Sequence, residues 1–129
     1  FQHADSTLTI ELPLEQDGCG LQVADSEQTQ AAVLNLIQNA LESCRPGGSV
    51  AVVVSLPDAL IQVDVLDNGP GVADAVRDRI FEPFVTGKPE GVGLGLTQAA
   101  QVAESGEGTL TYQRVGDLTR FRFQIRRIC

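Results

Sequence analysis

Residues 50–71 read VAVVVSLPDALIQVDVLDNGPG and indicate most directly which kind of fold to expect. Two apolar runs rich in β-branched residues, 50–56 and 60–67, are separated by a Pro-Asp turn, so we expect two paired strands. The sequence NGPG at 68–71 ends the second run in a glycine-rich turn. The chain should therefore contain a sheet in which one strand ends at a polar turn.

A helix is expected before these strands, from Asp25 or Ser26 to about Cys44. Either first residue can cap the helix, and the sequence RPGG that follows Cys44 ends it. At about 100° per residue, one broad stripe of this helix would face the core. The stripe contains Val33, Leu36, Ile37, Ala40, Leu41 and Cys44.

The other segments follow from their periodicity and turn residues. We expect a half-buried strand at 7–12, a strand at 21–24, helices at 73–80 and 94–104, and closing antiparallel strands at 108–115 and 119–126. The later helix would bury Leu96, Ala99, Ala100 and Ala103. Without regular β-α-β spacing, this order predicts an α+β fold, a two-layer sandwich with a mixed, mostly antiparallel sheet of about five strands against about three helices. Residues 1–129 are expected to form a single domain.

The composition excludes several classes of partner. Seventeen acidic and nine basic residues give a net charge of −8, which argues against binding to nucleic acid. No run approaches the roughly 20 apolar residues of a membrane span, so we expect a soluble, cytoplasmic chain without membrane contact. The absence of Met suggests a fragment, and its parent protein could be membrane-anchored. Cys19, Cys44 and Cys129 form no C-x-x-C pair, which favours buried or free thiols over a metal or disulfide role.

A glycine-rich segment with one lysine, FVTGKPEGVGLGLTQ, occupies residues 84–98. It is not a P-loop, because no Ser or Thr follows the lysine, and it is not a dinucleotide-binding turn, because it follows a loop rather than a strand. Its glycines leave backbone N–H groups open, and a helix that begins near Leu94 would turn its positive end toward them. This favours an anion site, with a mobile surface loop as the alternative. Lys88, the only lysine of the chain, is suited to reach a terminal phosphate.

Two further polar features are candidates for ligand binding. Asp67 would accept a hydrogen bond from the amino group of a base, while Gly69 and Gly71 would let the ring approach the backbone; a simple tight turn is the alternative. Asn35 and Asn39 lie one turn apart on the polar side of the first helix. They would offer amide oxygens to Mg²⁺, and a solvated polar face is the alternative.

Four motifs occur in one order along the chain: NLIQNA at 35–40, DNGPGV at 67–72, FEPF at 81–84 and GVGLGL at 91–96. They resemble the N box, first glycine box, F box and second glycine box of the ATP-binding catalytic domain of sensor histidine kinases. This domain belongs to a superfamily that also holds gyrase B subunits, heat-shock chaperone ATPases and mismatch-repair ATPases. The resemblance extends from about Ser6 to Ile125, and it favours the functional interpretation of each motif over its alternative.

The resemblance implies ATP and Mg²⁺ as cofactors and a role for each matching residue. Asn39 would be the Mg²⁺ ligand, and Asn35 would support the metal and the phosphates. Asp67 would take the amino group of adenine, in a pocket that Gly69 and Gly71 shape.

For the phosphate end, the resemblance implies a lid that closes on the nucleotide. Phe81 and Phe84 would anchor its ends, and the sequence looks most like kinases of the nitrogen-regulation type, which have a short lid. The lid lysine of those kinases reaches the γ-phosphate, and Lys88 matches it. The phosphates would be held by Gly91, Gly93, Leu94 and Gly95.

Position 35 discriminates between branches of the superfamily. Members that hydrolyse ATP usually carry a Glu four residues before the metal-binding Asn, and here that residue is Asn35. A histidine acceptor supplies its own nucleophilic nitrogen, so phosphotransfer is favoured over hydrolysis. Val92 replaces the usual Ser or Thr of the second glycine box, and the basic residue after the N box is missing.

The phosphoryl acceptor is not evident in this chain. Its only histidine, His3 in FQHADS, lies in no helical acceptor pattern. The resemblance implies an acceptor histidine on a separate dimerisation domain of the same parent protein, which in turn serves a response regulator; the isolated domain is expected to be a monomer. The alternatives are a catalytically impaired nucleotide-binding module, which Val92 favours, and a stand-alone ATPase, which Asn35 disfavours.

Overall fold

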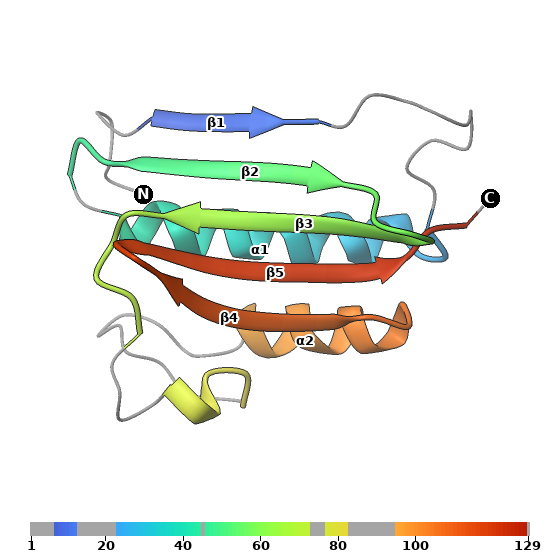
Figure 1. Ribbon diagram of the computed structural model, residues 1–129. Coiled ribbons are helices and arrows are strands. Elements are labelled where there is room, and N and C mark those ends of the chain that lie inside the picture. The colour runs from blue at the N-terminus through green and yellow to red at the C-terminus, as the bar shows by residue number, and fades with distance from the viewer. Residues whose placement is uncertain (1–6, 13–22, 45, 73–76, 83–94, 129) are drawn as a thin grey trace.

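The computed structural model describes residues 7–12, 23–44, 46–72, 77–82 and 95–128. In this part of the chain, one five-stranded sheet lies against a layer of helices (Figure 1). The strands take the order β1-β2-β3-β5-β4, in which β1 is parallel to β2 and the other three pairs are antiparallel. The predicted two-layer α+β fold with a mixed, mostly antiparallel sheet is confirmed. The strands are β1 (Thr7–Glu11), β2 (Ser49–Ser55), β3 (Leu60–Asp67), β4 (Thr109–Val115) and β5 (Leu118–Arg126).

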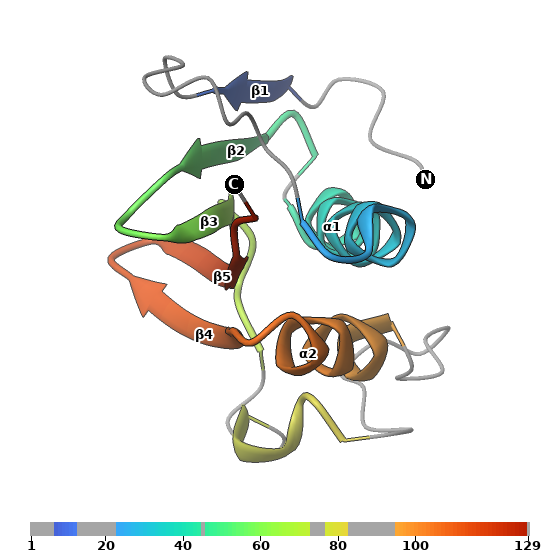
Figure 2. The ribbon, with the colours of Figure 1, turned by 90° about the vertical axis from the view of Figure 1, so that its right-hand side faces the viewer.

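The helices α1 (Ser26–Ser43) and α2 (Gly95–Ser105) cover the same face of the sheet. Figure 2 shows α1 over β2 and β3, with α2 beside it over β4 and β5. Asp25 caps α1 as predicted, since its Oδ1 accepts a hydrogen bond from the N–H of Gln28 at 3.1 Å. This arrangement encloses the core between the two layers.

The core contains the stripe that the helical period predicted. Leu36, Ala40 and Cys44 are buried, and Val33, Ile37 and Leu41 pack partly buried against the same core. On α2, Ala99 and Ala103 are buried while Leu96 and Ala100 are partly buried. The sheet contributes large side chains from alternate positions of β5, as a strand with one covered face should. These are Phe121, Phe123 and Ile125.

The opposite face of the sheet is polar. The Arg122 guanidinium donates from Nε to Asp64 Oδ1 at 2.9 Å and from Nη2 to Oδ2 at 3.2 Å, across the β3–β5 pair. This hydrogen-bonded carboxylate raises the pKa of Arg122, against the smaller opposing effect of burial. Beside it, Gln124 Nε2 donates to Gln62 Oε1 at 2.6 Å. The paired polar groups let this face meet water while Asp64 stays buried.

Between the two glycine-rich segments, the described residues do not contain the helix that was expected there. The helix expected at 73–80 appears in the described residues only as a 3₁₀ turn, η1 (Arg77–Arg79), so the described part holds two α-helices rather than about three. The turn is closed by Glu82, whose N–H donates to the carbonyl of Arg79 at 3.0 Å. Pro83 follows and disfavours a helical conformation at the residue before it, which prevents an extension of the turn.

The N-terminal strands also differ from expectation. Of the segment expected at 7–12, Thr7–Glu11 forms β1. All five of its residues are exposed rather than half-buried, because α1 packs over β2 and β3 and leaves the edge strand uncovered. The strand predicted at 21–24 is not present at Val23 and Ala24, the two of its residues that the structure describes. Val23 packs partly buried against the core, two residues before Asp25, the cap of α1.

Candidate functional site

The turn that follows β3 holds a buried carboxylate at its first residue. Asp67 is 1% exposed, and its Oδ1 accepts a hydrogen bond from the N–H of Gly69 at 2.8 Å. Gly69 is buried as well and packs against the end of α1. A Cβ atom at this position would lie 2.2 Å from the carbonyl oxygen of Ser43. The close approach of α1 therefore requires glycine at this position, and it fixes the turn against the end of the helix.

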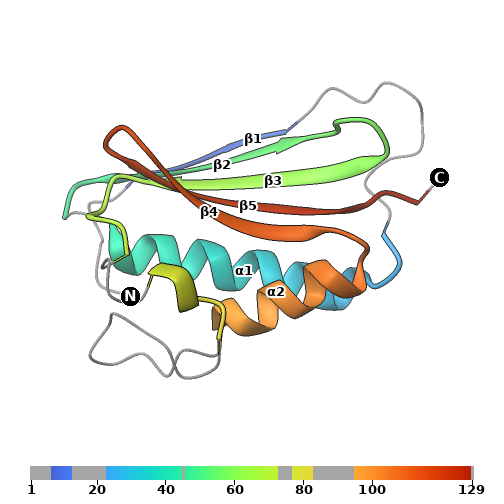
Figure 3. The ribbon, with the colours of Figure 1, turned by 60° about the horizontal axis from the view of Figure 1, so that its bottom comes forward.

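The polar face of α1 connects this turn with the start of α2. Asn35, Asn39 and Ser43 recur every four residues and so share one side of the helix. Ser43 touches Gly69, as described, and at the other end of the row a Cβ atom on Gly95 would lie 3.8 Å from Asn35 Cγ. Figure 3 shows the two helices side by side and antiparallel, so α2 begins beside the C-terminal half of α1.

Three of the four motifs thus lie along one side of α1, between the turn after β3 at Ser43 and the start of α2 at Asn35. The structure brings together Asn35, Asn39, Asp67, Gly69, Gly71 and Gly95. The ring of Phe81 packs edge-on against Phe121, with centroids 6.3 Å apart, so the first residue of the FEPF motif is attached to the core. The remaining predicted site residues lie outside the described part of the chain: Phe84, Lys88, Gly91, Gly93 and Leu94.

Three residues of the β4–β5 hairpin reach the turn, and sequence reasoning missed them. The hydroxyl of Tyr112 accepts a hydrogen bond from the N–H of Val72 at 3.1 Å. Arg114 Nη1 donates to the carbonyl of Gly69 at 2.7 Å and to Thr119 Oγ1 at 2.8 Å. The available signal was weak: alternation along both strands places these residues on the covered face, where a polar side chain needs a partner.

The donor set suits a hard cation that takes few ligands from the protein. In the described ranges, no three His, Cys, Asp or Glu side chains group closely enough to hold a metal ion by themselves. The half-buried Asn35 and Asn39 instead offer neutral amide oxygens beside the start of a helix. Mg²⁺ commonly takes few protein ligands and completes its shell with water and phosphate oxygens, so these residues fit it.

A groove of about 740 Å³ runs between α1 and α2, toward the end of α1 that is far from the turn after β3. It is lined by residues of α1 and α2, the segments next to them and the end of β5. It includes Asn35 but none of Asn39, Asp67, Gly69 or Gly71. The predicted site therefore borders this groove at one residue and is not formed by it. We place the candidate site at the turn and the helix start, where the buried carboxylate lies.

The chain resembles known proteins over most of its length. Residues 24–127 match the family described as histidine kinase-, DNA gyrase B-, and HSP90-like ATPase. The C4-dicarboxylate transport sensor protein DctB of Rhizobium meliloti is 34% identical over 121 residues, 92% of this chain and 19% of that protein. The sensory histidine kinase/phosphatase NtrB of Rhodobacter capsulatus is 30% identical over 116 residues, 80% of this chain and 33% of that protein. The chain therefore spans a third or less of the length of these relatives.

The fold has close counterparts among solved structures. The catalytic domain of the histidine kinase ThkA superposes with a TM-score of 0.82 at 26% identity, over 95% of this chain and 80% of that one. ThkA has also been solved in complex with the response regulator protein TrrA. Within the described residues, neither helix is long and apolar enough to cross a membrane.

Proposed function

Since this chain belongs to the family of histidine kinase-, DNA gyrase B- and HSP90-like ATPases, we propose that it binds ATP with Mg²⁺ and donates the γ-phosphoryl group to a histidine. The acceptor would lie on a separate dimerisation domain of the same parent protein, which passes the group to a response regulator. The observation that carries the proposal is the buried carboxylate of Asp67, held by the N–H of Gly69 beside the polar face of α1.

The adenine end of the site follows from that carboxylate. A buried Asp67 is an acceptor, and the exocyclic amino group of adenine is a donor of matching chemistry. Guanine carries a carbonyl oxygen at the corresponding position, which would face the carboxylate without a proton between them. Gly71 has φ of +81° and lines the same turn, where a side chain would enter the space beside Tyr112 and Arg114.

The phosphate end follows from α1 and α2. Asn39 and Asn35 would hold Mg²⁺ through amide oxygens, and the metal would supply charge neutralisation at the phosphates. The start of α2 at Gly95 presents the positive end of a helix beside Asn35, which favours an anion there. Gly91, Gly93, Leu94 and Lys88 would complete the phosphate contacts, and Phe81 and Phe84 would bound the lid.

Phosphotransfer suits this site better than hydrolysis. Asn35 cannot act as a general base, because an amide does not accept a proton near neutral pH. A histidine acceptor needs no such base, since its unprotonated ring nitrogen is already nucleophilic. The chain's own residues would then act by positioning the nucleotide and by stabilising its charge.

Calorimetric titration with a non-hydrolysable ATP analogue tests the proposal. We expect binding that requires Mg²⁺, and the Asp67→Asn variant should lose at least about tenfold in affinity, because its amide presents an N–H₂ group to the adenine amine. Absence of binding by the unmodified chain at millimolar ligand would sink the proposal.

Asp64→Asn is the matched control for this experiment. Asp64 is a buried aspartate on the same strand, but it faces the other side of the sheet and pairs with Arg122. The substitution should lower stability and leave nucleotide affinity unchanged. Steady phosphate release by the isolated chain would instead favour a stand-alone ATPase.

A further inference from the structure

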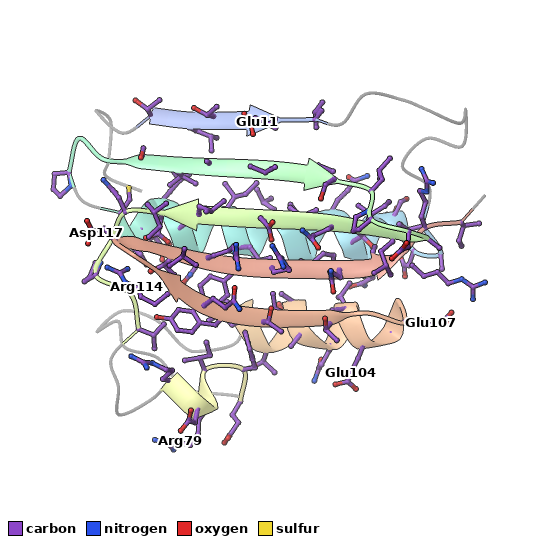
Figure 4. The ribbon with its side chains drawn as sticks, in the orientation of Figure 1. Glu11, Arg79, Glu104, Glu107, Arg114 and Asp117 are labelled. Carbon is purple, nitrogen blue, oxygen red and sulfur yellow. The ribbon has the colours of Figure 1, made fainter. Side chains whose placement is uncertain are left out.

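Arg114 of β4 contacts the proposed adenine-binding turn directly. One atom, Nη1, donates to the carbonyl oxygen of Gly69 at 2.7 Å and to Thr119 Oγ1 at 2.8 Å. The same atom would lie 3.2 Å from a Cβ on Gly71. Figure 4 shows Arg114 at the end of β4 next to the turn, far from Glu107 at the other end of that strand. The guanidinium therefore binds Gly69 and lies beside Gly71.

The order of the strands explains why this arginine is in place. Asp67 of β3 pairs with Thr119 of β5, and Thr119 pairs with Arg114 of β4. Residues in one cross-strand row project from the same face of a sheet. This row consequently lies beside the turn on the covered face of the sheet, and it consists of Asp67, Thr119 and Arg114. Arg114 reaches the turn although it lies 45 residues after Gly69 in the sequence.

The hydrogen bonds of this row form a chain that ends at the carboxylate. Arg114 donates to the carbonyl of Gly69, and the N–H of Gly69 donates to Asp67 Oδ1. A guanidinium has no acceptor, so Thr119 Oγ1 must accept from it, which leaves the hydroxyl proton of Thr119 available for another partner. Arg114 thus sets both the position of the turn and the donor direction of the Thr119 hydroxyl.

We propose that Arg114 is a positioning residue for adenine recognition, acting through Gly69 on Asp67 and through the hydroxyl of Thr119. This inference rests on the proposed nucleotide-binding function and adds a residue that determines base selectivity. Arg114 would not need to touch the base, because it holds the turn of Asp67 and the Thr119 hydroxyl, the two groups that would contact it. Among the described residues, the N–H of Val72 also holds this turn, through its hydrogen bond to the hydroxyl of Tyr112.

The test compares Arg114→Met with Arg114→Lys in calorimetric titrations with Mg²⁺ and a non-hydrolysable ATP analogue. Methionine keeps an unbranched stem without a donor, and we expect its dissociation constant to rise about tenfold. Lysine can donate to two oxygens from a single nitrogen, as Nη1 does, so it should restore affinity to within about threefold of the unmodified chain. Arg126→Met is the matched control, because Arg126 forms an exposed ion pair with Glu107. This substitution should leave the dissociation constant of the nucleotide unchanged.

A second measurement separates positioning from general support of the fold. The ratio of affinities for ADP and for purine riboside diphosphate, which lacks the 6-amino group, reports the contact with Asp67. We expect a ratio of about ten or more in the unmodified chain and a fall toward one in Arg114→Met. If Arg114→Met does not fold, Arg114→Leu, which also lacks a donor, takes its place with the same expectations. An unchanged affinity and ratio would overturn the inference while the proposed function stands, whereas failure of the unmodified chain to bind either nucleotide would overturn both.

Discussion

Gly69 is required by contact rather than by backbone conformation. Its carbonyl accepts a hydrogen bond from Arg114, and its N–H donates to Asp67. The space that a side chain would need is occupied by the carbonyl of Ser43. A methyl group 2.2 Å from a carbonyl oxygen cannot be accommodated unless α1 or the turn moves. Gly69, which the motif predicted would let a base ring approach the backbone, is thus also a point of tight packing against α1.

Gly69→Ala should lower the free energy of unfolding by about 3 kcal/mol, because the helix and the turn must separate. Gly116→Ala is the comparison: Gly116 has φ of +60° but nothing within 4 Å of a Cβ, so the cost should be about 1 kcal/mol of backbone strain. Urea unfolding of the three proteins measures the difference. Equal losses would show that contact with Ser43 is not the reason for glycine at position 69.

Among the strands, β1 and β3 differ most in what covers them. β3 lies between β2 and β5 and has α1 packed on one face, whereas β1 is an edge strand with five exposed residues. Leu8 and Ile10 of β1 pair with Val50 and Val52 of β2, so they are on the same face as the core but beyond the reach of α1. The position of a strand in the sheet, more than its own pattern, sets how much it stabilises the fold.

Two isoleucines test this point with the same substitution. Ile61→Ala in β3, where the side chain is 6% exposed, should cost about 3 kcal/mol of the free energy of unfolding. Ile10→Ala in β1, where it is 55% exposed, should cost less than about 1 kcal/mol. Urea unfolding again provides the measurement. A large loss for Ile10→Ala would mean that β1 is covered in solution by something that packs against it.

The site joins parts of both layers, so ligand binding and folding should be coupled. The turn after β3, the polar face of α1 and the start of α2 are adjacent only when the helices rest on the sheet. A nucleotide held by all three should therefore stabilise the folded chain and have little affinity for the unfolded one.

Removal of the metal tests this coupling. A non-hydrolysable ATP analogue at about 100 times its dissociation constant, with Mg²⁺ present, should raise the free energy of unfolding by about 2.7 kcal/mol. Addition of EDTA at the same nucleotide concentration should abolish most of this gain, because Asn39 and Asn35 would then have no Mg²⁺ to hold and the phosphate charge would no longer be neutralised. Thermal unfolding with and without EDTA measures the effect. An equal gain in EDTA would contradict a role for Mg²⁺ and leave nucleotide binding in place.

Much of the architecture follows from local sequence signals. β3 matches the expected segment 60–67, and the ends of α1 and α2 differ from expectation by about one residue. The core stripe of α1 was visible because a helix repeats every 3.6 residues whatever lies around it. The prediction failed at residues 77–79 and 23–24, where a short segment has too few turns or partners for its own pattern to decide its conformation.

The residues of the candidate site were likewise predictable only in part. Asn35, Asn39, Asp67 and the glycines could be named from their motifs, because each motif is contiguous and carries its chemistry in residues close along the chain. Arg114, Tyr112 and Thr119 could not, because their relation to the turn exists only once β5 lies between β3 and β4. Strand order and the exposure of β1 depend on contacts between segments that are far apart in the sequence. The free energy of the whole assembled core selects these contacts. Local periodicity depends only on residues a few positions apart, so it cannot predict them.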